Sequence, residues 1–557
     1  MILTLKILPF VLCHRAPRIF QLRTWPFEDA GGGLPKAESS YKLPSHRLSQ
    51  QPRRISPTPL FRGRRGCKKG APSSTFFALR NKGDDSVEPK SLCLAPLSQK
   101  RTFLKNPYLR AELSTMPKKK NLILILFLVV LFTFVGVGMY FSHEEKLPTQ
   151  KEAPQTPPRK GLNEWLTNEI SDMEALHGLD EKLKNYLTRW EINGAQLAIS
   201  RNDTLIYAKG YGMANKEENE TMTPRHIMRM ASVSKLITAA GIMKLRDMGL
   251  LELTDKVFGE EGILNDTAFT HIIRDKRYES ITVEHLLRHQ AGFGNRHGDP
   301  MFSTRFIMMG NHLDEAPDNR KLLEILLRRR LEYTPGLGQR YSNVGYMILS
   351  QIIEKLSGMP YEDFIKKHVL EPAGCFDFHI GGNYYEDRRE NEVKYYMHID
   401  ATPVPEFNNS GREVEKCYGE NDIPRLAGAG AWCASAAELC QFVGAIDLND
   451  GAPDILSKES LHLMTDEQPH YGYSCGWNFT PKGKPWTRTG TLSGTTALVV
   501  LYPDGQCWVM LTNTSTWKGQ GFAKNTQELF RQLRQKFADE LQSAPALREP
   551  NEKDKNN

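Results

Sequence analysis

Ser232-Val233-Ser234-Lys235 stands at the start of a long apolar stretch, and this placement constrains the fold more than any other feature of the chain. The residues that follow, 236–243, are almost all apolar or small. A helix that is apolar all round is a buried helix. A lysine in its first turn would lose most of its hydration, so it needs a specific role there. We therefore expect a buried helix whose first turn presents Ser232 and Lys235.

The spacing of these two residues suits nucleophilic catalysis. Residues three apart share a face of a helix, so the amine of Lys235 can reach Oγ of Ser232. A serine hydroxyl is a weak nucleophile that needs a neighbouring base, and burial favours the neutral form of lysine. Unpaired backbone N–H groups at the helix start add positive potential nearby. The pattern predicts Ser232 as nucleophile and Lys235 as its base; an ordinary surface Ser and Lys is the alternative.

Tyr341-Ser342-Asn343 is the second candidate motif. It follows a turn-rich stretch, 333–338, and precedes an apolar helical pattern over 344–356. Tyr341 is therefore expected on a loop, where functional side chains usually lie. A tyrosine there can relay a proton between nucleophile and leaving group. We predict that role for Tyr341 and a substrate-binding role for Asn343; a packed core tyrosine is the alternative.

Arg488-Thr489-Gly490 is the third candidate motif and leads into Thr491. Strand patterns over 495–501 and 506–511 are joined by Pro503-Asp504-Gly505, which predicts a hairpin. Glycine in the adjacent strand would let a substrate backbone approach closely. The N–H of Thr491 is expected to pair with that of Ser232 as an oxyanion hole. We predict that residues 488–491 bind the substrate.

Several segments in this order resemble one family. The class C β-lactamase-related family also holds low-molecular-weight penicillin-binding proteins, D,D-peptidases, D-aminopeptidases and some esterases. The likeness runs from about residue 165 to 540, and the segments that carry it are 194–200, 208–212, 231–235, 285–292 and 341–343. The resemblance implies a β-lactamase/transpeptidase-like fold, a bacterial membrane-anchored member, Ser232 as nucleophile, Lys235 as base, Tyr341 as proton relay and a substrate-binding third motif. It implies neither a cofactor nor a metal.

The chain departs from the family at Arg488. The third motif of the family usually begins with Lys or His. Arginine stays protonated in proteins, but it can bind a carboxylate through two parallel hydrogen bonds. The sequence therefore predicts that Arg488 anchors an anionic substrate, and it places a proton-transfer role at this position in doubt. A solvated strand arginine is the alternative.

Two other patterns suggest chemistry that we do not favour. Gly472-Tyr473-Ser474-Cys475-Gly476 matches the nucleophile elbow G-x-S-x-G, which requires a helix after the serine. Strand and turn residues follow instead, so Ser474 is not expected to be the nucleophile. His285 and His289 are spaced i, i+4, but Leu286 replaces the Glu of the H-E-x-x-H zinc motif. Packed or capping histidines are expected there, and no metal site.

Residues 121–141 carry no charged side chain and would span about 32 Å as a helix, enough to cross a bilayer. Pro117-Lys118-Lys119-Lys120 precedes this stretch, and two glutamates follow it. The positive-inside rule predicts a membrane anchor over 116–142, with the catalytic region outside the cytoplasm, either periplasmic or at the cell surface. A cleaved signal peptide is the alternative. Residues 143–164, which contain prolines and charges, are expected to be a linker.

The charge is unevenly distributed. Residues 1–120 carry 24 Lys and Arg against 7 Asp and Glu, whereas the remainder carries 49 against 58. The catalytic part is thus mildly acidic, and nucleic acid is not an expected partner. Residues 1–115 are rich in Pro and Ser without periodicity, which predicts a basic disordered leader. Since no Met lies between Met1 and Met116, we favour translation from Met116; an organelle transit segment is the alternative.

The rest of the chain predicts one α+β domain over 165–541, followed by a polar tail, 542–557. Strand patterns at 194–212 and 486–513 enclose a helical block at 232–372, and an amphipathic helix follows near 522–541. This order predicts an α/β sandwich: a mainly antiparallel sheet built from N- and C-terminal strands, flanked by helices, with an α-rich lobe. The cysteines beyond the anchor form no C-x-x-C pair, so no zinc site is expected. They are Cys375, Cys417, Cys433, Cys440, Cys475 and Cys507.

We therefore expect a membrane-anchored serine hydrolase that forms an acyl-enzyme on Ser232 with a small peptide-like or β-lactam substrate. Candidate substrates are D-Ala-D-Ala peptides, β-lactams and related D-amino-acid amides. An esterase with the same Ser/Lys/Tyr site is one alternative. A catalytically dead ligand-binding or scaffold protein, in which Arg488 blocks turnover, is the other. All the enzymatic readings use the same nucleophile, so the sequence leaves the substrate class open.

Overall fold

The computed structural model describes residues 161–296, 298–465 and 472–550. Six strands form its main sheet in the order β3-β2-β1-β11-β10-β9, and every neighbouring pair is antiparallel. The first three strands are β1 (Gly194–Arg201), β2 (Thr204–Asn215) and β3 (Glu220–Thr221). The last three are β9 (Trp486–Leu492), β10 (Thr495–Leu501) and β11 (Gln506–Thr512). The two ends of the domain therefore build one sheet, which confirms the predicted fold class.

The hairpins of this sheet follow from their turn residues. Between β1 and β2, Asn202 (φ 46°) and Asp203 (φ 62°) both adopt the left-handed backbone that a two-residue I′ turn requires. Gly494 (φ 85°) occupies the tight turn between β9 and β10. These turns join β1 to β2 and β9 to β10, and β9, which carries Arg488, lies at one edge of the sheet.

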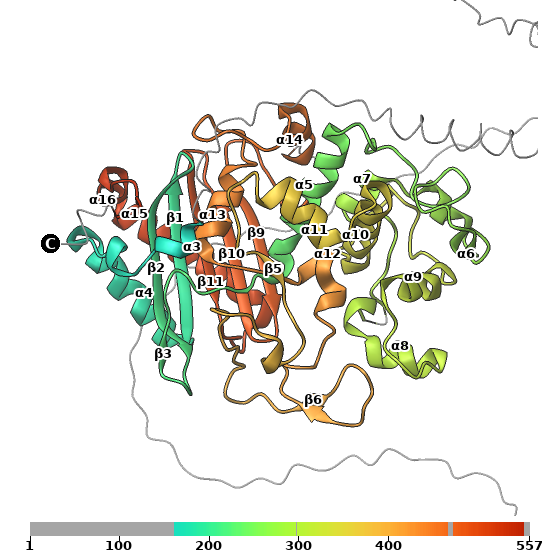
Figure 1. Ribbon diagram of the computed structural model, residues 1–557, viewed down its shortest axis with the longest axis horizontal. Helices are drawn as coiled ribbons and strands as arrows, with labels where there is room; N and C mark the ends of the chain where they lie inside the picture. Colours follow the sequence, from blue (N-terminus) through green and yellow to red (C-terminus); the bar gives the residue numbers. More distant parts are fainter. Residues whose placement is uncertain (1–160, 297, 466–471, 551–557) are drawn as a thin grey trace, which may run out of the picture. The chain divides into compact units, whose positions relative to one another are not determined.

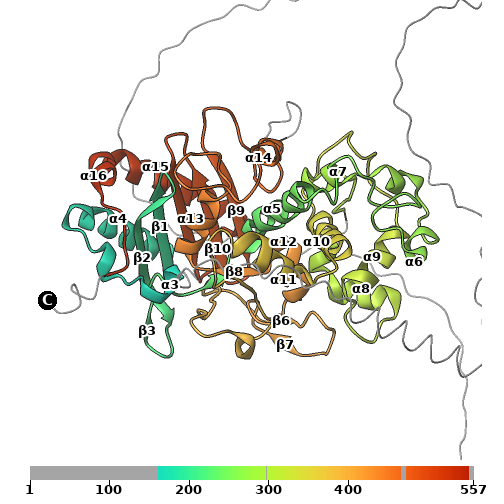
Figure 2. The same ribbon diagram turned by 45° about the horizontal axis from the view of Figure 1, so that its top comes forward.

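Helices cover both faces of the sheet, so β10 and β11 are buried along their whole length. One face packs against α4 (His177–Arg189), α15 (Phe522–Lys536) and α16 (Ala538–Ser543), where Trp508 and Phe530 share a core. The other face packs against α13 (Ala436–Gly444) and, near β9, α5 (Ser234–Asp247), as Figures 1 and 2 show. The domain is thus a sandwich of helices around a sheet.

The helical block predicted at 232–372 forms a lobe beside the sheet (Figure 2). Besides α5 it holds α6 (Thr267–Thr270), α7 (Val283–Leu287), α8 (Thr304–Asn311), α9 (Asn319–Leu327), α10 (Asn343–Ser357) and α11 (Tyr361–Ile365). The remaining short helices are α3 (Leu162–Trp165), α12 (Ala427–Gly430) and α14 (Lys458–Thr465).

Two small sheets were not predicted. One joins β4 (Met228–Arg229), β8 (Trp432–Ala434) and β5 (His379–Ile380), and the other pairs β6 (Val404–Pro405) with β7 (Glu413–Val414). Each strand has only two or three residues, too few to show an alternating pattern in the sequence.

Folded structure extends past both predicted bounds of the domain. Asn163 in α3, inside the predicted linker, is buried and donates a hydrogen bond to Glu438 at 3.2 Å. At the other end, the backbone N–H of Leu547, in the predicted polar tail, donates to the carbonyl of Leu205 at 2.8 Å. Both segments are thus held to the domain by hydrogen bonds, through the Asn163 side chain at one end and the Leu547 backbone at the other.

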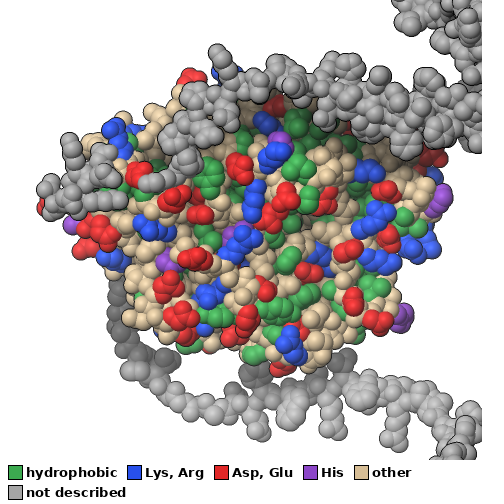
Figure 3. Space-filling model, viewed as in Figure 1, with side chains coloured by type: hydrophobic (Ala, Val, Ile, Leu, Met, Phe, Trp, Pro, Cys, Tyr) green, Lys and Arg blue, Asp and Glu red, His purple; other side chains and the backbone are tan. Residues whose placement is uncertain are grey.

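The predicted leader (1–115), the predicted anchor (116–142) and most of the predicted linker lie outside the described residues. Within the described ranges no helix combines the length and the apolar character needed to cross a bilayer. Acidic and basic side chains are interspersed on the face of the domain seen in Figure 3. This mixture agrees with the near balance of charge in the sequence after residue 120.

Candidate active site

Ser232 lies in a short 3₁₀ turn, Ala231–Val233, directly before α5. Ala231 has a left-handed backbone (φ 48°), which non-glycine residues keep only where the surrounding structure enforces it. Almost all of α5 is buried, as the sequence predicts, and Lys235 is among its buried residues. The turn packs against β9, so it holds the half-buried Ser232 beside the edge strand of the sheet.

The Lys235 amine is fully buried, with 0% of the residue exposed. Its Nζ lies 2.7 Å from Asn343 Oδ1, 2.5 Å from the Ala429 carbonyl oxygen and 3.4 Å from Ser232 Oγ. A neutral amine has two N–H donors and one lone pair. When both donors point at Asn343 and Ala429, the lone pair is left for the Ser232 hydroxyl.

Three effects set the protonation of Lys235. Burial comes first and lowers the pKa of the ammonium well below its usual range. The nearby positive charge of Arg488 lowers that pKa further, while the negative charge of Asp299 raises it. Burial and Arg488 thus favour the neutral amine, the form that a general base requires.

Tyr341 bonds the same nucleophile, and its hydroxyl lies 2.6 Å from Ser232 Oγ. The side chain of Ser342 accepts a hydrogen bond from Gly345 N–H and caps α10, which fixes the backbone just after Tyr341. Burial raises the pKa of the Tyr341 phenol, an effect that Arg488 and Ser232 partly offset. The phenol is therefore protonated at neutral pH, and Lys235 is the better candidate to accept the Ser232 proton.

Arg488 on β9 is also 0% exposed, and its guanidinium bonds protein acceptors. Nε donates to the Ser232 carbonyl at 2.8 Å, Nη1 to Asn478 Oδ1 at 3.1 Å and Nη2 to the Tyr341 hydroxyl at 3.3 Å. Three of its five N–H donors are therefore engaged by the protein, and Arg488 also lines the cavity at Ser232. These bonds tie the nucleophile turn to Tyr341.

The rest of the third motif lies against the same turn. Thr489 and Thr491 line the cavity at Ser232. A Cβ atom on Gly490 would lie 2.2 Å from the Met230 carbonyl oxygen and 3.0 Å from Ser232 N. The close approach expected at Gly490 is therefore made by the chain's own backbone rather than left open for a substrate.

The cavity at Ser232 has a volume of about 350 Å³. Its lining residues are Ser232, Tyr341, Tyr473, Asn478, Phe479, Arg488, Thr489, Thr491 and Gln520. Aromatic rings and a few polar groups share this wall, the usual composition of a small-molecule site. Five of the predicted site residues line this cavity, and Gly490 packs against the Ser232 turn. Lys235 and Asn343 are buried next to them and are hydrogen-bonded to each other.

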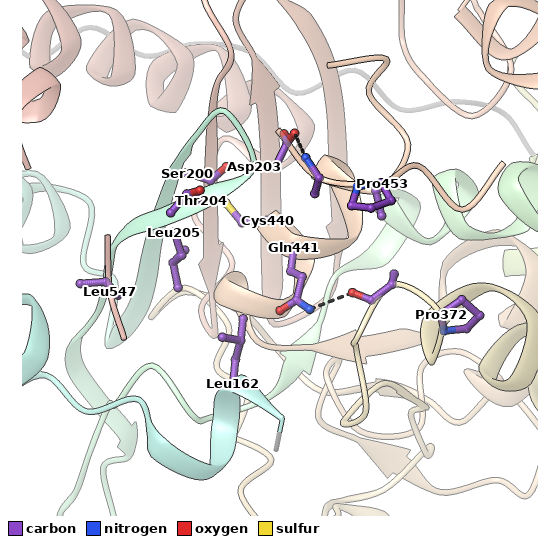
Figure 4. Close-up of a pocket in the computed structure, with 13 residues that line it drawn as sticks. Leu162, Ser200, Asp203, Thr204, Leu205, Pro372, Cys440, Gln441, Pro453 and Leu547 are labelled. Carbon is purple, nitrogen blue, oxygen red and sulfur yellow. Dashed lines mark hydrogen bonds between the residues drawn. The ribbon is translucent and has the colours of Figure 1, made fainter. Parts of the chain in front are cut away.

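A larger hollow of about 520 Å³ lies elsewhere, between the β1–β2 hairpin and α13 (Figure 4). Ser200 is in its lining, and its Oγ is buried without a hydrogen-bond partner. Among the residues that the structure describes, no Lys, Arg or His lines this hollow. Because a serine nucleophile needs an adjacent base, the smaller cavity at Ser232 is the better candidate for catalysis.

Two further residues support the site: Asp299, which the sequence analysis did not single out, and His289, which it predicted only to be packed or capping. Asp299 accepts a hydrogen bond from Asn343 Nδ2 at 2.8 Å. The buried His289 accepts one from Ser342 N–H at Nδ1 (3.2 Å), and its ring centre lies 4.6 Å from that of Tyr341. Burial lowers the pKa of His289 well below its usual range, so its ring is neutral. Asp299 belongs to none of the three motifs, and the position of His289 beside Tyr341 depends on tertiary contacts, so the structure is needed to identify both roles.

Ser474 and the two histidines, the residues of the two patterns that we did not favour, have packing or hydrogen-bonding roles in the structure. Ser474 Oγ is buried, and among the described residues its hydrogen-bond partner is Thr480 Oγ1 at 2.8 Å, which is not a base. His285 takes part in the N-terminal cap of α7, accepting from Thr282 N–H at 3.2 Å. Together with the packed His289, this confirms the predicted packed or capping histidines.

One group of potential metal ligands occurs among the described residues, away from the cavity: His379, Glu392 and Cys433. His379 Nε2 lies 3.1 Å from one Glu392 oxygen, and the Tyr395 hydroxyl donates to the other at 2.8 Å. These atoms are thus satisfied by protein partners as a buried hydrogen-bonded cluster.

Comparison with known proteins agrees with this geometry. Penicillin-binding protein 4* of Bacillus subtilis (strain 168) is 27% identical over 327 residues, which cover 56% of this chain and 66% of that protein. Esterase EstB of Burkholderia gladioli is 25% identical over 289 residues, covering 49% of this chain and 70% of that protein. The chain thus spans about two thirds of the length of these relatives.

The fold is also found among solved structures. That of D-amino acid amidase from Ochrobactrum anthropi SV3 superposes with a TM-score of 0.52 at 20% identity, covering 67% of this chain and all of that one. The family model for Beta-lactamase matches residues 179–532, which include all three motifs. Since this match covers more than half of the chain, the protein belongs to the beta-lactamase family of serine hydrolases.

Proposed function

We propose that this chain is a serine hydrolase that forms an acyl-enzyme on Ser232. One observation carries the proposal. Ser232 Oγ lies 3.4 Å from the amine of Lys235 and 2.6 Å from the hydroxyl of Tyr341, at the wall of a cavity of about 350 Å³. A nucleophile, a base whose neutral form is favoured by burial and a protonated acid then meet at one point where an acyl group can bind.

The reaction follows from these positions. Ser232 Oγ attacks the acyl carbon while its proton passes to Lys235 Nζ. The Tyr341 hydroxyl gives a proton to the leaving nitrogen or oxygen and regains one from Lys235. The N–H groups of Ser232 and Thr491 are proposed to stabilise the oxyanion. Water then hydrolyses the ester on Ser232 and releases the acid.

The proposed substrates are peptide-like acyl donors: D-Ala-D-Ala peptides, β-lactams or related D-amino-acid amides. The names of a penicillin-binding relative and of an amidase with this fold support this class. Thr489 and Thr491, which line the cavity, are proposed to bind the substrate through their side chains, and the buried Asn343 is proposed to contribute through its bond to Lys235. An esterase is the second candidate, supported by the match to EstB. A dead scaffold is disfavoured because the three proposed catalytic side chains are in contact.

Acylation distinguishes these readings. The purified chain is incubated separately with a fluorescent penicillin and with an activated ester, and its intact mass is followed over time. We expect a stoichiometric mass increase with at least one donor. A persistent penicillin adduct indicates a penicillin-binding protein, and adduct formation with the ester alone indicates an esterase. No adduct and no turnover with either donor would favour the scaffold reading.

We also propose that the domain is held outside the cytoplasm by the anchor at 116–142. The support is the sequence pattern alone: Lys118 to Lys120 precede an uncharged stretch. Protease added to intact spheroplasts that express the chain is expected to remove the domain. A domain that is protected until the spheroplasts are lysed would contradict this orientation.

A further inference from the structure

Asp299 lies outside all three motifs but contacts the site through Asn343. The Asn343 amide has two different ends, and both are engaged. Its Nδ2 donates to Asp299 Oδ2 at 2.8 Å, and its Oδ1 accepts from Lys235 Nζ at 2.7 Å. Only an acceptor can hold the Nδ2 end, so the Asp299 carboxylate fixes the orientation in which the amide oxygen faces Lys235.

We propose that Asp299 is a positioning residue for the general base: it orients the Asn343 amide, which in turn aims the lone pair of Lys235 at Ser232. The inference rests on the proposed function of these residues. If the amide were reversed, Nδ2 would meet the N–H groups of Lys235, and the amine would lose one of its two acceptors. The lone pair would then no longer be directed at the nucleophile.

Local structure holds Asp299 in place for this task. Its Oδ1 accepts a hydrogen bond from Met301 N–H at 2.9 Å and caps the short 3₁₀ helix Pro300–Phe302. Its backbone carbonyl accepts from the Ser303 hydroxyl at 2.8 Å. One carboxylate oxygen therefore anchors the residue, and the other remains for Asn343.

Asp299 also contributes charge to the site. The titratable and charged groups that face Lys235 come from the lobe and from β9, and they are Asp299, His289, Tyr341, Tyr346 and Arg488. Burial keeps His289 neutral and both tyrosines protonated. Arg488 and Asp299 are thus the two charges that act on Lys235, and they act in opposite directions: Arg488 lowers its pKa and Asp299 raises it.

The Asp299→Asn variant tests the orientation of Asn343 separately from the capping of the 3₁₀ helix. Asparagine has the same size and is an equally good helix cap, so its Oδ1 can keep the bond to Met301 N–H. Its Nδ2 then faces Asn343 Nδ2, where two donors meet and no hydrogen bond forms. Asp299→Ser is the second variant, because serine also caps helices but is too short to reach Asn343. Asp314→Asn, which removes an exposed carboxylate of the same lobe, is the matched control.

The rate of acylation by an activated ester is measured as a function of pH for the full chain and each variant, with thermal unfolding as the folding check. In Asp299→Asn the plateau rate is expected to fall by about 10-fold, as suits a modest misplacement of the base. The loss of the carboxylate charge lowers the pKa of Lys235, so the acid limb of the profile should move to lower pH. Asp314→Asn should match the native chain in both respects.

Two results would overturn the inference. A folded Asp299→Asn or Asp299→Ser chain with a native plateau rate would show that Asn343 needs no orientation by Asp299. A lower rate with an unmoved acid limb would show that the residue acts only through local stability. In both cases the native chain is still acylated, whereas failure of the proposed function would appear as no acylation of the native chain itself.

Discussion

Replacing Lys235 by alanine is expected to lower the rate of Ser232 acylation by about 10²- to 10⁴-fold, the range found for loss of a general base. The amine is fully buried and its pKa is lowered by burial and by Arg488, which favours the neutral form that can accept a proton. Of the two described side chains that contact Ser232 Oγ, Lys235 is the base, because Tyr341 holds its proton. Single-turnover acylation with an activated ester measures the effect.

Lys244→Ala is the matched control, since Lys244 lies in the same helix. Its Nζ donates to the carbonyl of Ile455 at 3.0 Å, and it does not line the cavity at Ser232. We expect near-native acylation from this variant. A folded Lys235→Ala chain that reacts as fast as Lys244→Ala would exclude Lys235 as the base.

Arg488→Gln is expected to lower acylation by roughly 10- to 100-fold, because a misplacement of about 1 Å at a reacting group has effects of up to this size. The guanidinium holds both the Ser232 carbonyl and the Tyr341 hydroxyl, and glutamine cannot span the two. These contacts are independent of the substrate. A carboxylate substrate and its matched amide should therefore lose rate to a similar degree.

The pH profile of this variant gives a second check. The charge of Arg488 lowers the pKa of Lys235, so its removal raises that pKa, and the acid limb should move to higher pH. Arg488→Lys keeps the positive charge but loses the planar guanidinium fork. Its acid limb in the pH profile should stay nearer the native position, while its rate of acylation should still fall. If Arg488→Gln lowered the acylation rate only with the carboxylate substrate, Arg488 would recognise an anionic group, as the sequence predicts.

The sequence predicted the parts of the site that depend on local structure. Ser232 and Lys235 are three residues apart at the start of an apolar helix, and helical geometry alone places them on one face. Tyr341 precedes a helix that begins at a serine cap, which the sequence also shows. The sheet was predictable because its hairpin turns carry residues suited to a left-handed backbone.

Features that depend on long-range contacts were not predictable. Asp299 is close to Asn343 only because the loop before α8 packs against α10, and nothing in its own neighbourhood marks it. The orientation of Arg488 depends on two acceptors, the Ser232 carbonyl and Asn478, that lie far from it in sequence. These contacts of the guanidinium with the chain itself could therefore not be predicted from the sequence.

The position of the acyl group tests the central claim most directly. The full chain is acylated with an activated ester or a fluorescent penicillin, denatured at acid pH and digested, and the modified peptide is sequenced by tandem mass spectrometry. We expect the label on Ser232 alone, and no label after Ser232→Ala. Label on Ser474, or an equal yield of adduct from the Ser232→Ala chain, would contradict the account.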